Sequence, residues 1–195
     1  MTRNVAILIF DEVEVLDFCG PFEVFGVTGR NQTPKPFNVY TVAEKSPITA
    51  RNGLSVNPTY TLENCLQPDI LLVPGGAGTR REMNNPTIIN WIKEQFPKVE
   101  LMLSVCTGAL MLGKAGLLDG LAATTHFGAE AELREAAPNT TIRMSERYVD
   151  NGKVITSAGI SAGIDMALYT VGHLLGAEVA ADTAHHMQYD YWKGQ

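Results

Sequence analysis

The chain alternates short, wholly apolar runs with longer segments in which apolar residues recur at helical spacing. Such runs are typical of strands buried on both faces, and the segments that follow them are typical of helices. The predicted strands cover residues 4–10, 37–43, 69–76, 99–105 and 121–126. Because strands that alternate with helices form βαβ units, the pattern predicts a mostly parallel sheet with helices on both faces.

Two segments depart from this alternation. Residues 45–62 are rich in turn-forming residues and predict a small hairpin. Residues 141–159 predict a second hairpin, because Asp150-Asn151-Gly152 is a strong turn signal. Two helical segments, 160–176 and 177–192, end the chain. No linker or repeat interrupts the pattern, so we expect residues 1–195 to form one α/β domain with three layers.

Composition and charge narrow the range of partners. Of the 195 residues, 45% are apolar and 18% charged, and the formal net charge is −6 without any basic run. This balance argues against nucleic acid and anionic membranes as main partners. No apolar stretch is long enough to span a membrane, and we interpret the start of the chain as a first strand and not as a secretory signal.

The three cysteines, Cys19, Cys65 and Cys106, form neither pairs nor a C-x-x-C motif. An odd number of widely spaced cysteines predicts free thiols in a reducing cytoplasm, without a disulfide framework or a zinc site. We favour a core position for Cys19 over a role as redox partner of Cys106, and Cys65 has no feature that suggests chemistry. His185 and His186 are neighbours and make a poor metal site with Asp182, so we expect a solvated surface there.

Cys106 lies where a buried strand must turn sharply into a helix. The pattern Ser104-x-Cys106-x-Gly108 is close to the nucleophile elbow, in which small residues on both sides let strand and helix approach each other. The N-terminus of the next helix would stabilise a thiolate and lower the pKa of the thiol. The alternative is a small buried side chain at a strand end. We favour a reactive cysteine.

Other candidates follow the predicted strands, because ligands of open α/β sheets bind at the carboxyl ends of the strands. The loops of interest come after Phe10, Val73, Val105, His126 and Ser157. Asp17 follows the first of these strands, so its carboxyl group could share a proton with the thiol. A helix N-cap before a helix that starts near Pro21 is an equally good interpretation. Glu23, further along, is expected to be exposed.

Three further segments could line a pocket. Gly75 and Gly76 end a strand, and their N–H groups could form an oxyanion hole, although tight turns use such glycines too. His126 could be a base or a hydrogen-bond partner of a thiolate, and a structural histidine is a slightly better interpretation. Residues 157–163, "SAGISAG", are small and could supply backbone donors, among them Gly159.

Four segments together resemble the ThiJ/PfpI superfamily, which is related to class I glutamine amidotransferases. They are "LDFCGPFEVF", "ILLVPGGAG", "LSVCTGALMLGKAGLLDGLAATTHF" and "NGKVITSAGISAGIDMALYTV". The resemblance covers essentially the whole chain and is most specific toward isocyanide hydratases and the amidase-like domains of AraC-type activators. It implies a flavodoxin-like α/β sandwich that forms a homodimer, with the elbow cysteine near the interface.

The resemblance also implies roles for individual residues. Cys106 would be the nucleophile and Asp17 its carboxylate partner, with Thr107, Gly76 and Ile160 in the pocket. Hydration of an isocyanide would proceed through a thioimidate on Cys106, without a metal or an organic cofactor. Proteases of the superfamily carry histidine directly after the cysteine, where this chain has Thr107. Glyoxalase-like and deglycase-like members carry glutamate at the position that Asp17 matches.

Three functions remain open at this stage. The first is a cysteine-dependent hydratase of a small electrophile, with an isocyanide as the expected substrate. The second is a non-enzymatic module that binds a small molecule, although the chain ends at Gln195 without room for the DNA-binding region of the sensor-type relatives. The third is a redox or stress protein whose Cys106 is oxidised to a sulfinate. The aimed pair of Asp17 and Cys106 favours the first.

Overall fold

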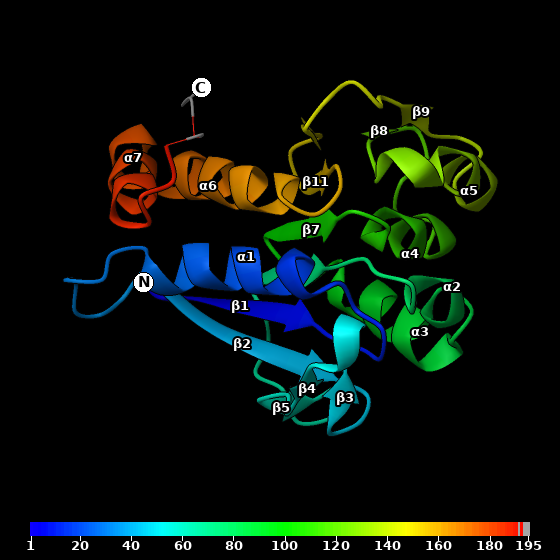
Figure 1. The fold of residues 1–195 in the computed structure, drawn as a ribbon, viewed down its shortest axis with the longest axis horizontal. Coiled ribbons are helices and arrows are strands. Elements are labelled where there is room, and N and C mark those ends of the chain that lie inside the picture. Colours follow the sequence, from blue (N-terminus) through cyan, green and yellow to red (C-terminus); the bar gives the residue numbers. More distant parts are fainter. Residues whose placement is uncertain (191, 193–195) are drawn as a thin grey trace.

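Seven strands form one sheet at the centre of the computed structural model, which describes residues 1–190 and 192 (Figure 1). Across the sheet they are ordered β10 (Tyr148–Asp150), β11 (Val154–Ser157), β7 (Leu101–Val105), β6 (Ile70–Val73), β1 (Arg3–Leu8), β2 (Phe37–Ala43) and β5 (Tyr60–Thr61). All neighbouring strands are parallel except β10 and β11. Because β6 and β7 are buried along their whole length, their sequences are apolar nearly throughout. The mostly parallel sheet is thus confirmed.

The helices form two groups around this sheet. One group consists of α1 (Val15–Val27), α6 (Ala162–Leu175) and α7 (Ala177–His186), which pack on one another. The other consists of α2 (Thr79–Glu82), α3 (Pro86–Gln95), α4 (Gly108–Lys114) and α5 (Glu130–Ala136). The arrangement is the predicted flavodoxin-like α/β sandwich of three layers (Figure 1).

Both predicted hairpins are present. In the first, β3 (Ile48–Thr49) pairs antiparallel with β4 (Ser55–Val56), and the 3₁₀ turn η1 (Arg51–Gly53) lies between them. In the second, β10 and β11 are joined at Gly152, whose φ of 80° requires the freedom that glycine has.

The prediction of a strand over residues 121–126 is wrong for the main sheet. Only β8 (Ala122–Ala123) is extended, and it pairs with β9 (Thr141–Ile142) in a separate two-stranded sheet. Side chains of the main sheet hold the segment across its edge: Asn151 bonds both backbone groups of Ala122, and Thr156 Oγ1 accepts the N–H of Thr124. These hydrogen bonds satisfy the backbone without a new strand. The 3₁₀ turn η2 (Phe127–Ala129) follows.

Helix α1 begins earlier than the sequence predicts. It starts at Val15, so Pro21 lies inside it, and its N-cap is Glu14. Asp17 is therefore the third helical residue, and its interpretation as an N-cap is wrong. The expected core position of Cys19 is also wrong, because Cys19 is exposed on the outer side of α1.

The order in which the chain adds strands to the sheet reverses between β1 and β6. From β1 the chain goes to β2 on one side of it, and then returns to β6 on the other side. The loops that follow β1 and β6 meet at this point, where Val13 and Gly76 form a β-bridge. Ligands of open α/β sheets bind at such a point, at the carboxyl ends of the strands. The order of the strands therefore predicts the position of a site, with β7 next to β6 on the same side.

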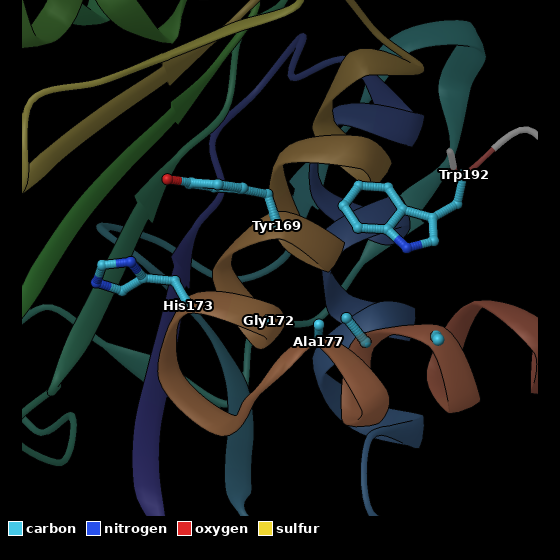
Figure 2. Close-up of a pocket in the computed structure, with 7 residues that line it drawn as sticks. Tyr169, Gly172, His173, Ala177 and Trp192 are labelled. Atoms are coloured by element: carbon cyan, nitrogen blue, oxygen red, sulfur yellow. The ribbon is translucent and has the colours of Figure 1, made fainter. Parts of the chain in front are cut away.

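A second hollow lies at the opposite end of α6. This groove has a volume of about 360 Å³ and is lined by Tyr169, Gly172, His173, Ala177, Ala180, Ala181 and Trp192 (Figure 2). None of these lining residues carries a thiol or carboxyl group. Within residues 1–190 and 192, no helix is long and apolar enough to cross a membrane.

Candidate active site

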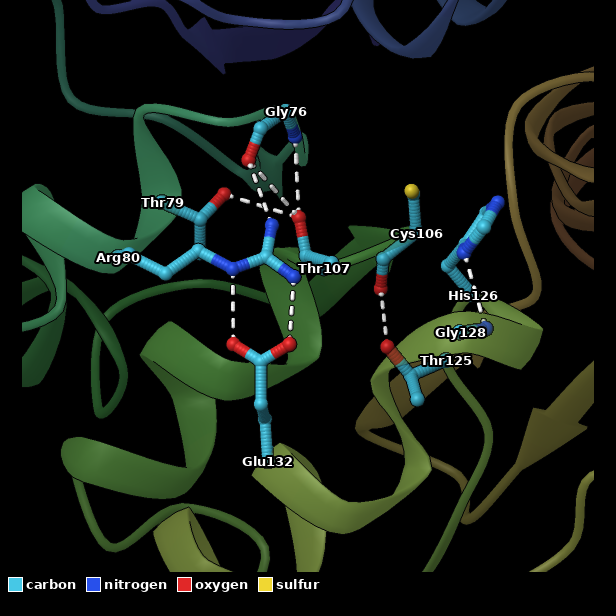
Figure 3. Close-up of polar contacts among 9 residues, drawn as sticks. All are labelled: Gly76, Thr79, Arg80, Cys106, Thr107, Thr125, His126, Gly128 and Glu132. Atoms are coloured by element: carbon cyan, nitrogen blue, oxygen red, sulfur yellow. Dashed lines mark hydrogen bonds and ion pairs between the residues drawn. The ribbon is translucent and has the colours of Figure 1, made fainter.

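Cys106 occupies a strained turn between β7 and α4. Its φ of 57° lies in the left-handed region, which residues other than glycine rarely adopt. Hydrogen bonds hold the turn on both sides: the N–H of Cys106 lies 3.2 Å from the carbonyl oxygens of Ser157 and Ala158, and the hydroxyl of Thr125 donates to the Cys106 carbonyl at 2.8 Å (Figure 3). The fold thus fixes the thiol at the edge of the sheet.

Small residues beside Cys106 are required, as the elbow pattern predicts. A Cβ atom on Gly108 would lie 2.0 Å from the carbonyl oxygen of Val73, so only glycine lets α4 leave the strand so close to β6. Ser104, two residues before the cysteine, is fully buried. The sharp turn from strand to helix is therefore confirmed.

Asp17 is fully buried in the first turn of α1 and belongs to the same site. The N–H of Gly75 donates to its Oδ2 at 3.0 Å, while Oδ1 accepts no hydrogen bond of standard geometry from any residue that the structure describes. Burial raises the pKa of the Asp17 carboxyl to about 7, against the effects of the Gly75 N–H, the Cys106 thiol and the Ile160 N–H, which favour the charged form. A carboxyl group with this pKa can take up and release a proton near neutral pH.

The pKa of the Cys106 thiol differs from the expectation, which was a lowered value. Burial, and after it the negative charge of Asp17, raise the pKa of this thiol to about 12. The N–H groups of Thr107 and Ile160 oppose these effects without outweighing them. Because an ionised Asp17 disfavours the thiolate, the two groups form one acid–base pair, which loses its first proton near pH 7 and holds the second tightly.

Gly75 and Gly76 serve the site in another way than predicted. The N–H of Gly75 is bonded to Asp17, and the N–H of Gly76 donates to Thr107 Oγ1 at 3.0 Å. The hydroxyl of Thr107 also lies 3.2 Å from the Gly76 carbonyl and 3.0 Å from the hydroxyl of Thr79 (Figure 3). Since both N–H groups already have protein acceptors, they are not free to bind an oxyanion.

An open cleft of about 330 Å³ leads to Cys106. Its walls are Glu14, Arg51, Gly76, Ala77, Arg80, Cys106, Thr107, His126, Gly128 and Ile160. The segments come from the loops that we expected at the carboxyl edge, joined by the hairpin at η1. Of the predicted pocket residues, Gly76, Thr107, His126 and Ile160 line the cleft. Gly75 and Gly159 lie behind this lining.

Three charged residues of the cleft were not predicted. Arg80 binds the carboxylate of Glu132 through two nitrogens, at 2.6 and 2.7 Å (Figure 3), and Arg51 binds that of Glu12 at 2.7 Å. Glu14 is the N-cap of α1 and lies three residues before Asp17. The sequence signal that could have pointed to Glu14 as a cleft residue is its short distance from Asp17 along the chain. Arg51 and Arg80 have no such signal, because tertiary structure brings them to the cleft.

His126 lines the cleft and also has the structural role that the sequence favoured. Its Nδ1 accepts the N–H of Gly128 at 3.1 Å, which makes His126 the cap of η2. Its ring packs directly on Gly159, where an added Cβ would lie 2.3 Å from Cδ2 of the imidazole. Gly159 therefore leaves the space that the histidine ring occupies.

We expect Gly159→Ala to destabilise the protein by about 1–3 kcal/mol, because the new methyl group overlaps the ring of His126. In a His126→Ala background the same substitution should cost much less. Urea unfolding of the wild type, both single variants and the double variant measures this coupling. An equal cost of Gly159→Ala in both backgrounds would contradict the packing described.

The remaining candidates lie away from the cleft. Glu23 is exposed, as expected, and so are His185 and His186. Cys65 is partly buried and lies 3.8 Å from the carbonyl oxygen of Leu62. In the part of the chain that the structure describes, no cluster of histidine, cysteine, aspartate and glutamate could hold a metal ion.

Comparison with known proteins connects this geometry to a family. Residues 3–172 match the model of the DJ-1/PfpI family. An isonitrile hydratase of Pseudomonas putida is 34% identical over 189 residues, which are 97% of this chain and 79% of that protein. The crystal structure of a ThiJ/PfpI family protein from Pseudomonas syringae superposes with a TM-score of 0.87 at 30% identity, covering 97% of this chain and 76% of that one.

Regulators of transcription are similar as well. A helix-turn-helix transcriptional regulator of Pseudomonas aeruginosa is 28% identical over 184 residues. The match covers 94% of this chain and 54% of the regulator, so this chain corresponds to about half of that protein.

Proposed function

The chain belongs to the DJ-1/PfpI family, and from this premise we propose that it is a cysteine-dependent hydratase that converts a small isocyanide into an N-substituted formamide. One observation carries the proposal: a buried carboxyl group with a pKa near 7, that of Asp17, is coupled to a cysteine on an elbow at the base of an open cleft. The similarity to an isonitrile hydratase supports this choice of substrate.

The first half of the reaction adds the thiol across the isocyanide carbon. Asp17, as the nearest base, takes the proton of Cys106 while the sulfur attacks the terminal carbon of R–N≡C. The protonated carboxyl group then delivers this proton to the same carbon. The product is a thioimidate, R–N=CH–S–Cys106, and Asp17 is a carboxylate again.

The second half adds water. Asp17 removes a proton from a water molecule that attacks the thioimidate carbon, and the nitrogen is protonated to give R–NH–CH(OH)–S–Cys106. Collapse of this adduct breaks the C–S bond, releases R–NH–CHO and returns the proton to the pair. Water is the sole co-reactant, and a carboxyl group with a pKa near 7 suits both directions of proton transfer.

The proposal is tested with the purified chain and a simple aryl isocyanide. We expect the formamide to form with saturation kinetics and in proportion to enzyme. The rate should rise with pH through about 7, because Asp17 must be ionised to accept the thiol proton. Absence of turnover by a chain that is folded by circular dichroism would contradict the hydratase function.

The regulator matches favour a second candidate, a module that binds a small molecule in the same cleft without converting it. Isothermal calorimetry with the isocyanide and with the formamide separates the two. Saturable binding without product would favour the binding module, whereas turnover would exclude it as the full description.

We also propose a homodimer that uses the outer face of α1. Leu16 and Phe22 lie on this face with 38% and 37% of their surface exposed, and Cys19 lies between them. Ile160 at the cleft is 37% exposed. Large apolar side chains grouped on one helix face favour contact with a second protein surface.

Replacing both Leu16 and Phe22 with glutamate is expected to halve the mass in solution, from twice the chain mass of 21.2 kDa to once that mass. Two buried charges without partners would make the interface unfavourable. Light scattering after size exclusion measures the change. Leu54→Glu, at another exposed leucine, is the control and should leave the mass unchanged.

A cytoplasmic location is part of the proposal. Its support is chemical: the three cysteines are all free, which suits a reducing compartment.

A further inference from the structure

Ile160 adopts a conformation that its own side chain disfavours. Its φ is 52°, in the left-handed region, where a β-branched residue is strained. The N–H of this residue faces the pair of Cys106 and Asp17 and favours the charged form of both groups. The shape of the loop at 158–161 thus contributes to how well the pair can carry a negative charge, and hydrogen bonds from outside the loop hold it in this shape.

Arg147 directly precedes β10 and contacts the chain on both sides of Ile160. Before it, the carbonyl oxygen of Arg147 accepts the N–H of Ala158 at 2.8 Å. After it, the guanidinium group forms an ion pair with Asp165 and lies 3.5 Å from the hydroxyl of Ser161. One residue therefore fixes both ends of the strained segment.

Asp165 anchors this arrangement in the core. It is buried in the first turn of α6, with 8% of its surface exposed. Its Oδ2 binds Arg147, and its Oδ1 accepts the hydroxyl of Tyr189 at 3.1 Å. This bond ties the partly exposed Arg147 side chain to a buried carboxylate, and hydrogen bonds between charged groups are stronger than those between neutral ones.

We propose that Arg147 and Asp165 form a positioning pair, which holds the loop at 158–161 so that the Ile160 N–H faces the reactive cysteine and its carboxyl partner. Neither Arg147 nor Asp165 lines the cleft. They act through the backbone, and their removal weakens the stabilisation of negative charge on Cys106 and Asp17 without removing any group that touches substrate. The inference rests on the reactive Cys106 of the proposed function and is independent of the substrate.

Other charged and titratable groups also face the cysteine and the carboxyl group. They are Glu14 from the loop after β1, Arg51 from η1, Arg80 from α2 and His126 before η2. None of them contacts the positioning pair through a hydrogen bond or ion pair that the structure contains within residues 1–190 and 192. The variants below leave all four unchanged.

The test measures the rate at which iodoacetamide alkylates Cys106 between pH 5 and 10, in Arg147→Ala and in Asp165→Asn. Mass spectrometry of the Cys106 peptide distinguishes this thiol from Cys19 and Cys65. The midpoint of the profile reports the first deprotonation of the pair, near pH 7. We expect both variants to move this midpoint upward by about half a pH unit or more, which is about threefold in rate below the midpoint. No isocyanide is needed, so failure of the proposed substrate does not affect the result.

The two variants distinguish positioning from a direct effect of charge. Removing the positive charge of Arg147 would raise the midpoint through space, and removing the negative charge of Asp165 would lower it. Upward shifts in both variants would support the positioning pair. Opposite shifts, or no shift in either folded variant, would overturn it. Arg143→Ala is the matched control, since Arg143 pairs with Glu146 in the same connection and should leave the profile unchanged.

Discussion

Replacing Cys106 with alanine is expected to lower the rate of formamide formation by at least about 10³-fold, because the proposed thioimidate forms on the sulfur of Cys106. The loss should appear in kcat, since the walls of the cleft remain in place. Steady-state kinetics with an aryl isocyanide, followed by chromatography of the formamide, measures the change. Removal of the small thiol should leave the fold intact, which thermal unfolding checks.

Cys65→Ala serves as the control for Cys106→Ala. Cys65 is a free and partly buried cysteine in another part of the molecule, and its replacement should retain the wild-type rate. If Cys106→Ala also retained most of the rate, the covalent mechanism would be wrong even though turnover itself was real. A general-base mechanism centred on Asp17 would then be the remaining explanation.

Asp17→Asn is expected to lose turnover and to gain stability at neutral and alkaline pH. The pKa of Asp17 rises from 3.8 to about 7 on folding, so folding favours the protonated carboxyl group. Its contribution to stability is fully present below about pH 4 and is lost as the pH rises to about 7. Asparagine carries no charge, so the variant avoids this loss, which amounts to up to about 4 kcal/mol.

Urea unfolding of the wild type and Asp17→Asn at several pH values measures the difference. The two curves should separate between pH 4 and 7 and run parallel above that range. Glu23→Gln, which changes an exposed carboxyl group on the same helix, should show no comparable separation. A constant difference from pH 4 to 8 would show that folding does not raise the pKa of Asp17.

The sequence permitted the site to be located because its main signal is local. Ser104 and Gly108 flank Cys106 at fixed spacing, and the geometry that makes them necessary, a close approach of β6 to α4, follows from a parallel sheet. The alternation of strands and helices likewise predicts the sheet and its carboxyl edge. Asp17 was a candidate for the same reason, since it follows the first strand.

Other features depend on partners far away in the chain. The N–H groups of Gly75 and Gly76 could not be assigned until the structure showed Asp17 and Thr107 as their acceptors. The raised pKa of Cys106 comes from burial, whereas the sequence offered only the helix N-terminus. Residues 121–126 have the composition of a strand, but side-chain hydrogen bonds from Asn151 and Thr156 hold Ala122 and Thr124 in place of pairing with a strand of the main sheet.

The cleft takes its walls from segments between Glu14 and Ile160, each carried by a different loop. Closing such distant parts of a chain is slow, because the entropy of long loops is lost before the contacts form. The site therefore exists only once the strands β1, β6, β7 and β11 have all taken their places. Reactivity of Cys106 in this cleft is thus a marker of the completed native state. Because each wall is a separate loop, the sequence of one loop can change in evolution while the sheet beneath stays the same.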